Sequence, residues 1–160
     1  MLVSDLIVRG SMWLALSCFV AGHVGFRRAR PSRAARWAVS TYWLGLALAM
    51  AHAAAAFHWH HDWSHARAVA ATAAETARTF GLDWGGGVWV NYGFLATWLA
   101  DATWRTARRT PGPSGSAAAA WPIRGFYLIV IASGAVVFVA WPMTLLGVAL
   151  VAVLLWSWRP

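Results

Sequence analysis

The sequence predicts an all-α protein, a polytopic bundle of about five transmembrane helices that forms a single integral membrane domain over residues 1–160. Three observations predict this fold class. Hydrophobic residues make up 60% of the chain and charged residues only 11%. The apolar stretches are about 16 to 21 residues long, close to the ~20 residues that a helix needs to cross a hydrocarbon layer of ~30 Å. Arg-rich or Gly/Pro-rich segments separate them.

The expected spans cover residues 6–26, 37–57, 87–104, 125–140 and 143–158. The last two are short, and a single helix over both would be about 50 Å long, which is too long for a bilayer. We therefore expect a tight hairpin with Pro142, which has no backbone N–H, at its turn. Residues 105–124 are the expected cytoplasmic linker, and the Pro, Gly and Ala residues at 110–120 predict a flexible connector.

The arginines predict the orientation. Ten of the 13 basic residues lie in the first loop, in the third loop or after the last span, namely Arg27, Arg28, Arg30, Arg33, Arg36, Arg105, Arg108, Arg109, Arg124 and Arg159. The positive-inside rule then predicts that the N-terminus lies outside, the C-terminus is cytoplasmic and the His-rich segment 58–86 lies outside. We expect an integral protein of a bacterial inner membrane, with that segment on the periplasmic or extracellular side.

A helix on the outer side is expected over residues 64–80. This stretch is rich in Ala, carries Glu75 and Arg78 three positions apart, and ends at Gly81. Such a helix lies at the surface or continues the second span, and a dip into the membrane is a further alternative.

Several functions are disfavoured by composition and missing motifs. The net charge of +8 suggests nucleic acid, but the arginines sit at the ends of apolar segments, so membrane topology explains them and no nucleic-acid partner is expected. A single cysteine, Cys18, allows no disulfide within the chain. The sequence has no phosphate-binding Gly-rich loop with Lys, no Cys-based redox pair and no two-His metalloprotease helix. Whether the protein is an enzyme stays open.

The run from Phe57 to His65 is the densest chemical feature of the chain. On one continuous helix to His65, the face formed by His58, His61, His65 and Asp62 would be about 100° wide, and His60 would point away. Three imidazoles and a carboxylate suit a transition metal, so these four residues are the candidate ligands for Zn, Cu or Fe. The alternative is a polar, water-facing cap on a membrane helix that binds nothing in particular.

Three other residues are candidates to support such a site. Asp83 and Asn91, at the start of the third span, offer oxygen atoms near the histidine face. His52 lies within the second span, and an ionisable group at that depth is a functional candidate by default. It is a possible metal ligand or one step of a proton path, or a neutral imidazole hydrogen-bonded across a helix interface.

A haem is not expected. His23 lies near the cytoplasmic end of the first span, so it and His52 differ in depth and do not suit the two axial positions of one iron. We expect His23, beside Arg27 and Arg28, to face lipid headgroups. Asp101, four residues before Arg105, most simply pairs with that arginine.

Two functions of different class follow from these patterns. One is a multi-pass membrane protein with a transition-metal site at the outer membrane face. The other is a non-catalytic structural or assembly subunit of a larger membrane complex, with the His run as a polar interfacial cap. Expected partners are the lipid bilayer and either other membrane chains or further copies of this chain, packed through small residues such as Ser133, Gly134, Gly147 and Ala149.

Overall fold

The computed structural model describes residues 3–28, 34–108 and 117–159, and every regular element within these ranges is a helix. The all-α prediction is therefore confirmed for the described part of the chain. The elements are α1 (Val3–Arg28), α2 (Ala34–His60), α3 (His65–Phe80), α4 (Gly87–Arg108), α5 (Ala117–Ala132), the π-helical segment η1 (Ser133–Val137) and α6 (Met143–Ser157).

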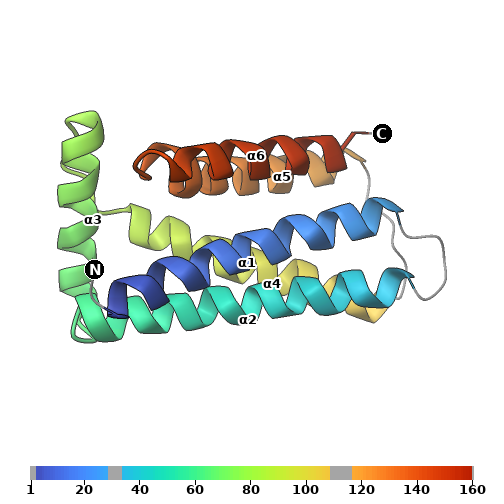
Figure 1. Ribbon diagram of the computed structural model, residues 1–160, viewed down its shortest axis with the longest axis horizontal. Coiled ribbons are helices and arrows are strands. Elements are labelled where there is room, and N and C mark those ends of the chain that lie inside the picture. The colour runs from blue at the N-terminus through green and yellow to red at the C-terminus, as the bar shows by residue number, and fades with distance from the viewer. Residues whose placement is uncertain (1–2, 29–33, 109–116, 160) are drawn as a thin grey trace.

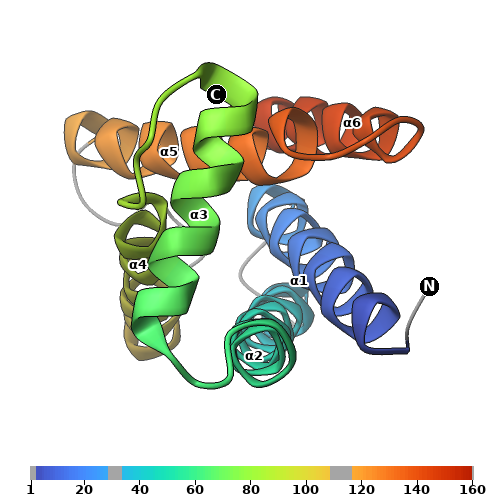
Figure 2. The same ribbon diagram turned by 90° about the vertical axis from the view of Figure 1, so that its left-hand side faces the viewer.

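The helices form a bundle that is closed at one end. Helices α1, α2 and α4 run along the long axis, and the pair formed by α5 and α6 packs across them on one side (Figures 1 and 2). Helix α3 lies crosswise over the end where α2 finishes and α4 begins (Figure 1). The helix expected over residues 64–80 therefore exists as α3, and it turns away from α2 instead of continuing it.

Two described helices are long and apolar enough to cross a membrane, judged by length and composition: α1 and residues Arg36–His60 of α2. Two further stretches, Trp121–Val137 and Met143–Ser157, are apolar but shorter than 18 residues. The expected fourth span, 125–140, differs in its bounds, because helical structure begins at Ala117 and ends at Val137.

Both ends of α3 carry the local signals that stop a helix. Ser64 is its N-cap, and the side-chain oxygen accepts a hydrogen bond from the backbone N–H of Arg67. Gly81 ends the helix in the left-handed region, with φ of 71°, and its N–H donates to the carbonyl of Ala77. Glu75 and Arg78 form the ion pair that their spacing suggests.

The helix assumed across the His run is wrong. Helix α2 ends at His60, and the next residues form a turn in which Asp62 and Trp63 have φ of 47° and 56°. The Trp63 N–H reaches back to the carbonyl of Phe57 at 2.9 Å, which closes the end of α2. Since two left-handed residues separate the two helices, His58 and His65 do not belong to one helical face.

The hairpin at Pro142 is confirmed. The backbone N–H groups of Met143 and Leu145 bond to the carbonyls of Ala140 and Pro142 there. Within the hairpin, Gly147 allows α6 to approach η1 closely, since a Cβ added at this glycine would lie 1.9 Å from the carbonyl oxygen of Ala135. Gly147 therefore packs against its own chain.

Part of the expected linker 105–124 is helical, since α4 continues to Arg108 and α5 begins at Ala117. The rest of it, residues 109–116, lies outside the described residues, as do Arg30 and Arg33. The prediction of a flexible connector falls mostly on these residues.

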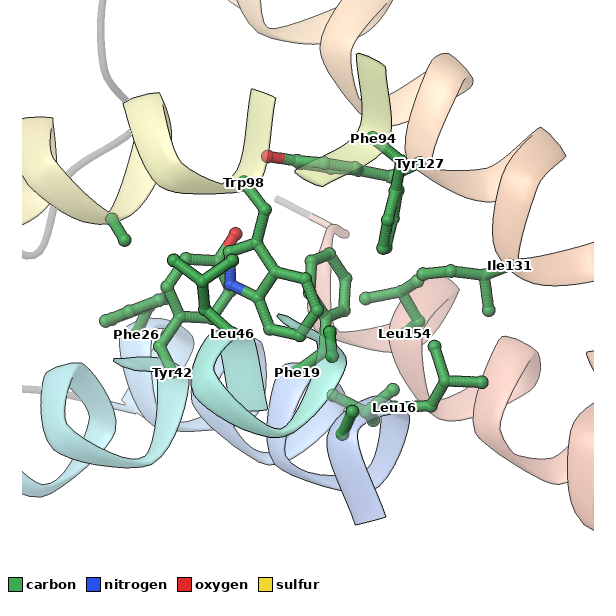
Figure 3. Close-up of a cluster of buried hydrophobic side chains, with 14 of the residues drawn as sticks. Leu16, Phe19, Phe26, Tyr42, Leu46, Phe94, Trp98, Tyr127, Ile131 and Leu154 are labelled. Carbon is green, nitrogen blue, oxygen red and sulfur yellow. The ribbon is translucent and has the colours of Figure 1, made fainter. Parts of the chain in front are cut away.

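One aromatic core joins five helices. Phe19 of α1 lies at its centre, with ring centroids 4.7 Å from Trp98, 5.0 Å from Tyr127 and 5.4 Å from Tyr42. Figure 3 shows these rings converging with aliphatic side chains from the neighbouring helices, including Leu46, Ile131 and Leu154. The core occupies the middle of the bundle, and a cavity lies between the core and α3.

Candidate functional site

The residues of the His run make separate local contacts. His60 Nε2 lies 3.8 Å from a carboxylate oxygen of Asp5, which ties the end of α2 to the start of α1. Asp62 forms an ion pair with Arg67. His65 Nδ1 lies 3.2 Å from the hydroxyl of Tyr92 on α4.

The rings of the three candidate ligands meet different aromatic partners. His58 lies against Trp59 and Trp63, His61 against Phe57, and His65 against Trp89 and Tyr92. Among the described residues, no three His, Cys, Asp or Glu side chains are grouped so as to hold a metal ion. Binding of Zn, Cu or Fe by this run stays a prediction from the sequence.

His52 links two helices. Its Nδ1 lies 2.7 Å from the backbone carbonyl of Val8 on α1. Because a carbonyl only accepts, Nδ1 carries the proton, and Nε2 of the neutral ring is left as an acceptor. Of the interpretations open for His52, this contact matches the imidazole that bonds across a helix interface.

The expectation that His23 faces headgroups is wrong. Only 6% of this residue is exposed, and its Nδ1 lies 3.0 Å from the carbonyl of Phe19 one turn earlier. The imidazole packs 4.4 Å from the ring of Phe19 and 5.3 Å from that of Tyr42. These partners come from the same helix and from α2, and sequence periodicity alone does not place them together.

A large cavity lies between the aromatic core and α3. Its volume is about 1140 Å³, and its walls come from α1, α2, α4, the α5–η1 segment and the start of α6, with α3 as its roof. Ligand pockets typically measure about 300–1,000 Å³, so this space is large enough for a molecule of substantial size. We call it the outer cavity.

The polar residues that line the outer cavity lie toward α3, among apolar residues such as Val88 and Phe138, and the floor is apolar. Near α3 the walls include Thr72, Asn91 and Tyr92, whereas the floor is formed by side chains that also belong to the core, namely Leu16, Phe94 and Ile131. This order follows the helices, since Asn91 lies in the first turn and a half of α4 and Phe94 lies a turn deeper. The cavity therefore has the polarity of an amphipathic molecule.

Two formally charged side chains line the outer cavity, Arg9 and Glu75. Glu75 is paired with Arg78. Arg9 is exposed and makes no hydrogen bond, ion pair or ring contact with any residue that the structure describes. A positive charge without an ion-pair partner among the described residues thus lies at the edge of an apolar space.

His61 is a second residue of the cavity lining that has a polar group without a partner among the described residues. Its Nδ1 is buried and has no hydrogen-bond partner in the described part of the chain. Removal from water, and to a smaller extent the neighbouring His60, lower the pKa of His61 below its ordinary value. A neutral imidazole at this position is able to donate or accept one hydrogen bond.

The structure brings three of the seven sequence candidates to the lining of one cavity: His52, His61 and Asn91. His58, His65 and Asp62 make the separate contacts described above, and Asp83 is exposed between α3 and α4. Sequence reasoning missed Arg9 and Tyr92 as members of this site. Arg9 carried one usable signal, because it is a cation six residues inside an apolar helix.

The fold and site define a class, an all-helical bundle with an amphipathic cavity beneath a crosswise helix. Comparison with models of protein families, with curated protein sequences and with solved structures finds no match to this chain. The cavity is therefore the feature from which we infer function.

Proposed function

We propose that this chain is an integral membrane protein with five spans, an outside N-terminus and a cytoplasmic C-terminus, which holds an amphipathic, lipid-like molecule in the outer cavity. The observation that carries the proposal is the polarity of the cavity walls, with polar side chains beneath α3 and core residues at the floor. A pocket with mostly apolar walls and a few converging polar groups is the usual form of a ligand site.

The helix lengths and outer surfaces support membrane insertion of the whole bundle. Helix α4 is about 33 Å long, and α5 together with η1 is about 32 Å, both near the thickness of a hydrocarbon layer. Large apolar side chains on the outside of the helices are exposed, for example Leu44, Ile129 and Leu145. A lipid environment covers such residues at no cost.

The arginines support the proposed orientation. Arg27 donates hydrogen bonds to the carbonyls of Trp156 and Arg159, at the end of the bundle opposite α3. Arg105 and Arg124 belong to the same end, where α4 finishes and α5 begins. The positive-inside rule favours a cytoplasmic position for this end.

In this proposal the His run is the polar interfacial cap that the sequence offered as an alternative to a metal site. Its contacts with Asp5 and Tyr92 tie α2 to α1 and the start of α3 to α4, so these contacts hold α3 over the cavity. Association with other membrane chains, or with a second copy, stays a prediction from the sequence.

A cavity-filling substitution tests the proposal. Ala56 lines the cavity, whereas Ala54 is exposed on the same helix, so Ala56→Phe and Ala54→Phe form a matched pair. We expect native mass spectrometry of gently purified wild-type protein and of A54F to show one retained lipid-sized molecule. The A56F variant should retain severalfold less, because the added ring occupies the cavity. Equal retention in A56F and wild type would contradict the proposed function.

A further inference from the structure

We propose that the occupant of the outer cavity is an anionic phospholipid, with its phosphate beside Arg9 and an acyl chain on the apolar floor. This inference rests on the proposed function and names the ligand class for the same cavity. Two observations carry it. Arg9 has no ion-pair partner among the described residues, and the polar residues of the cavity lining lie toward α3 while the floor is apolar.

The charge at the cavity favours an anion. Arg9 has no partner among the described residues, whereas the one carboxylate in the described lining, on Glu75, already pairs with Arg78. An arginine guanidinium offers up to five donors in a planar fork that matches phosphate oxygens. A ligand phosphate supplies the acceptors that Arg9 lacks.

The positions of the charged and apolar lining residues along α1 match the headgroup and the acyl chain of a phospholipid. Arg9 lies about 9 Å along α1 from Val3, near the same end of the bundle as α3. Leu16 lies about 10 Å deeper on the same helix and contributes to the floor. A lipid with its phosphate at Arg9 thus places its chain along α1 toward the core.

The polar groups near α3 suit the part of a lipid between phosphate and chains. His61 Nδ1 is buried without a partner, and Asn91 and Tyr92 line the same cavity. Ester and glycerol oxygens accept hydrogen bonds, and these side chains are able to donate them. The wall therefore offers donors where the ligand carries neutral acceptors.

Exposed apolar side chains line the mouth of the cavity. Leu6, Leu14 and Met143 belong to its lining and are themselves 61%, 59% and 40% exposed. They lie on α1 and at the start of α6, which diverge toward the α3 end (Figure 1). An acyl chain can enter between these helices without leaving an apolar environment.

The test compares two phospholipids with the same acyl chains and the same phosphate, one with an anionic headgroup and one with a zwitterionic headgroup. The delipidated full chain is titrated in detergent micelles with phosphatidylglycerol or phosphatidylcholine of identical acyl chains, and binding is measured by native mass spectrometry. We expect about a fivefold preference of the wild type for phosphatidylglycerol, the size of one favourable charge contact near a membrane surface. Arg9→Gln should remove this preference, and Arg9→Lys should keep most of it. Arg67→Gln, which changes an arginine outside the cavity, is the matched control.

The outcomes separate the inference from the proposed function. Equal binding of both lipids by the wild type, with loss of both in A56F, overturns the anionic ligand and leaves the cavity as a binding site. An unchanged preference in R9Q, or the same loss in R67Q, also overturns the assignment to Arg9. Binding of both lipids that A56F leaves unaffected overturns the proposed function itself. Circular dichroism of each variant verifies that the helices are intact.

Discussion

Asp101 joins α2 to α4 through one carboxylate. It accepts hydrogen bonds from the Tyr42 hydroxyl of α2 at 2.9 Å and from Arg105 Nε at 2.8 Å. The guanidinium of Arg105 also lies 4.3 Å from the ring of Phe26 on α1. The pairing of Asp101 with Arg105, expected from their spacing, is confirmed, whereas the contacts with Tyr42 and Phe26 depend on tertiary packing.

Loss of this carboxylate should destabilise the protein strongly. The Asp101 and Arg105 side chains are only 12% and 14% exposed, so Asp101→Ala leaves a largely buried cation and a tyrosine hydroxyl without an acceptor. We expect the free energy of unfolding to fall by about 3 kcal/mol. Denaturant titration in detergent micelles measures the change. The control is Glu75→Gln in the exposed pair with Arg78, where less than about 1 kcal/mol is expected.

Metal content tests the remaining hypothesis for the His run. Since His58, His61 and His65 face different aromatic partners, we expect little bound metal in the purified protein. The triple alanine variant should then contain the same small amount by elemental analysis. One metal ion per chain in the wild type, lost in the variant, would restore the metal site.

At the scale of elements, the helix ends decide which sequence predictions succeed. Ser64, Gly81 and Pro142 act through their own backbone or side-chain chemistry, so α3 and the last hairpin are predictable from the sequence. Trp63 gives no such signal, because a bulky residue rarely adopts positive φ. The sequence therefore does not predict that α2 ends before His61. It also does not predict that His58 and His65 lie on different helices.

Gly147 should be intolerant of any side chain. Gly147→Ala forces a Cβ against the Ala135 carbonyl, so η1 and α6 have to move apart. We expect a loss of roughly 1–3 kcal/mol in the free energy of unfolding. The matched control is Gly125→Ala, where an added Cβ meets no neighbour within 4 Å. That variant should be neutral or more stable by up to ~1 kcal/mol, since alanine favours helix. Similar losses in both variants would contradict the close approach.

Acid should loosen the attachment of α3. Because the pKa of folded His61 is lowered, its stabilising contribution is complete above the ordinary histidine pKa of about 6.5 and declines as the pH falls below it. The ion pairs of Asp5 with His60 and of Asp62 with Arg67 flank this ring. Hydrogen exchange of α3 amides, corrected for intrinsic rates, should accelerate between pH 7.5 and 5.5. His61→Gln should weaken this pH dependence, and an identical profile in both proteins would refute it.

At the scale of the whole molecule, composition alone predicts a helical bundle, but it does not predict the interior. His23 and Trp98 are buried against rings from several helices, and no periodicity in the chain reports those partners. The outer cavity is likewise a product of packing, since its walls come from segments that are up to 137 residues apart, from Leu6 to Met143. Sequence reasoning found three of its polar residues while assigning them to a metal site.

Cysteine labelling tests the orientation of the bundle. With Cys18→Ala as background, Ser64→Cys and Ser114→Cys introduce one thiol each, in the outer segment and in the expected cytoplasmic linker. A membrane-impermeant maleimide added to intact cells should label the first variant and not the second. Permeabilised cells should show labelling of both. The opposite pattern would invert the proposed topology, and labelling of both in intact cells would rule out the proposed spans.

The crosswise position of α3 determines which concentration governs occupancy of the cavity. The helix covers the end of the bundle, while the mouth between α1 and α6 is lined by exposed apolar residues such as Leu6 and Leu14. A ligand that enters sideways partitions into the bilayer first, so its mole fraction among lipids sets the occupancy by mass action. Diluting the membranes with more buffer leaves that mole fraction unchanged. Under the proposed function, the bound state of the protein reports the composition of one leaflet.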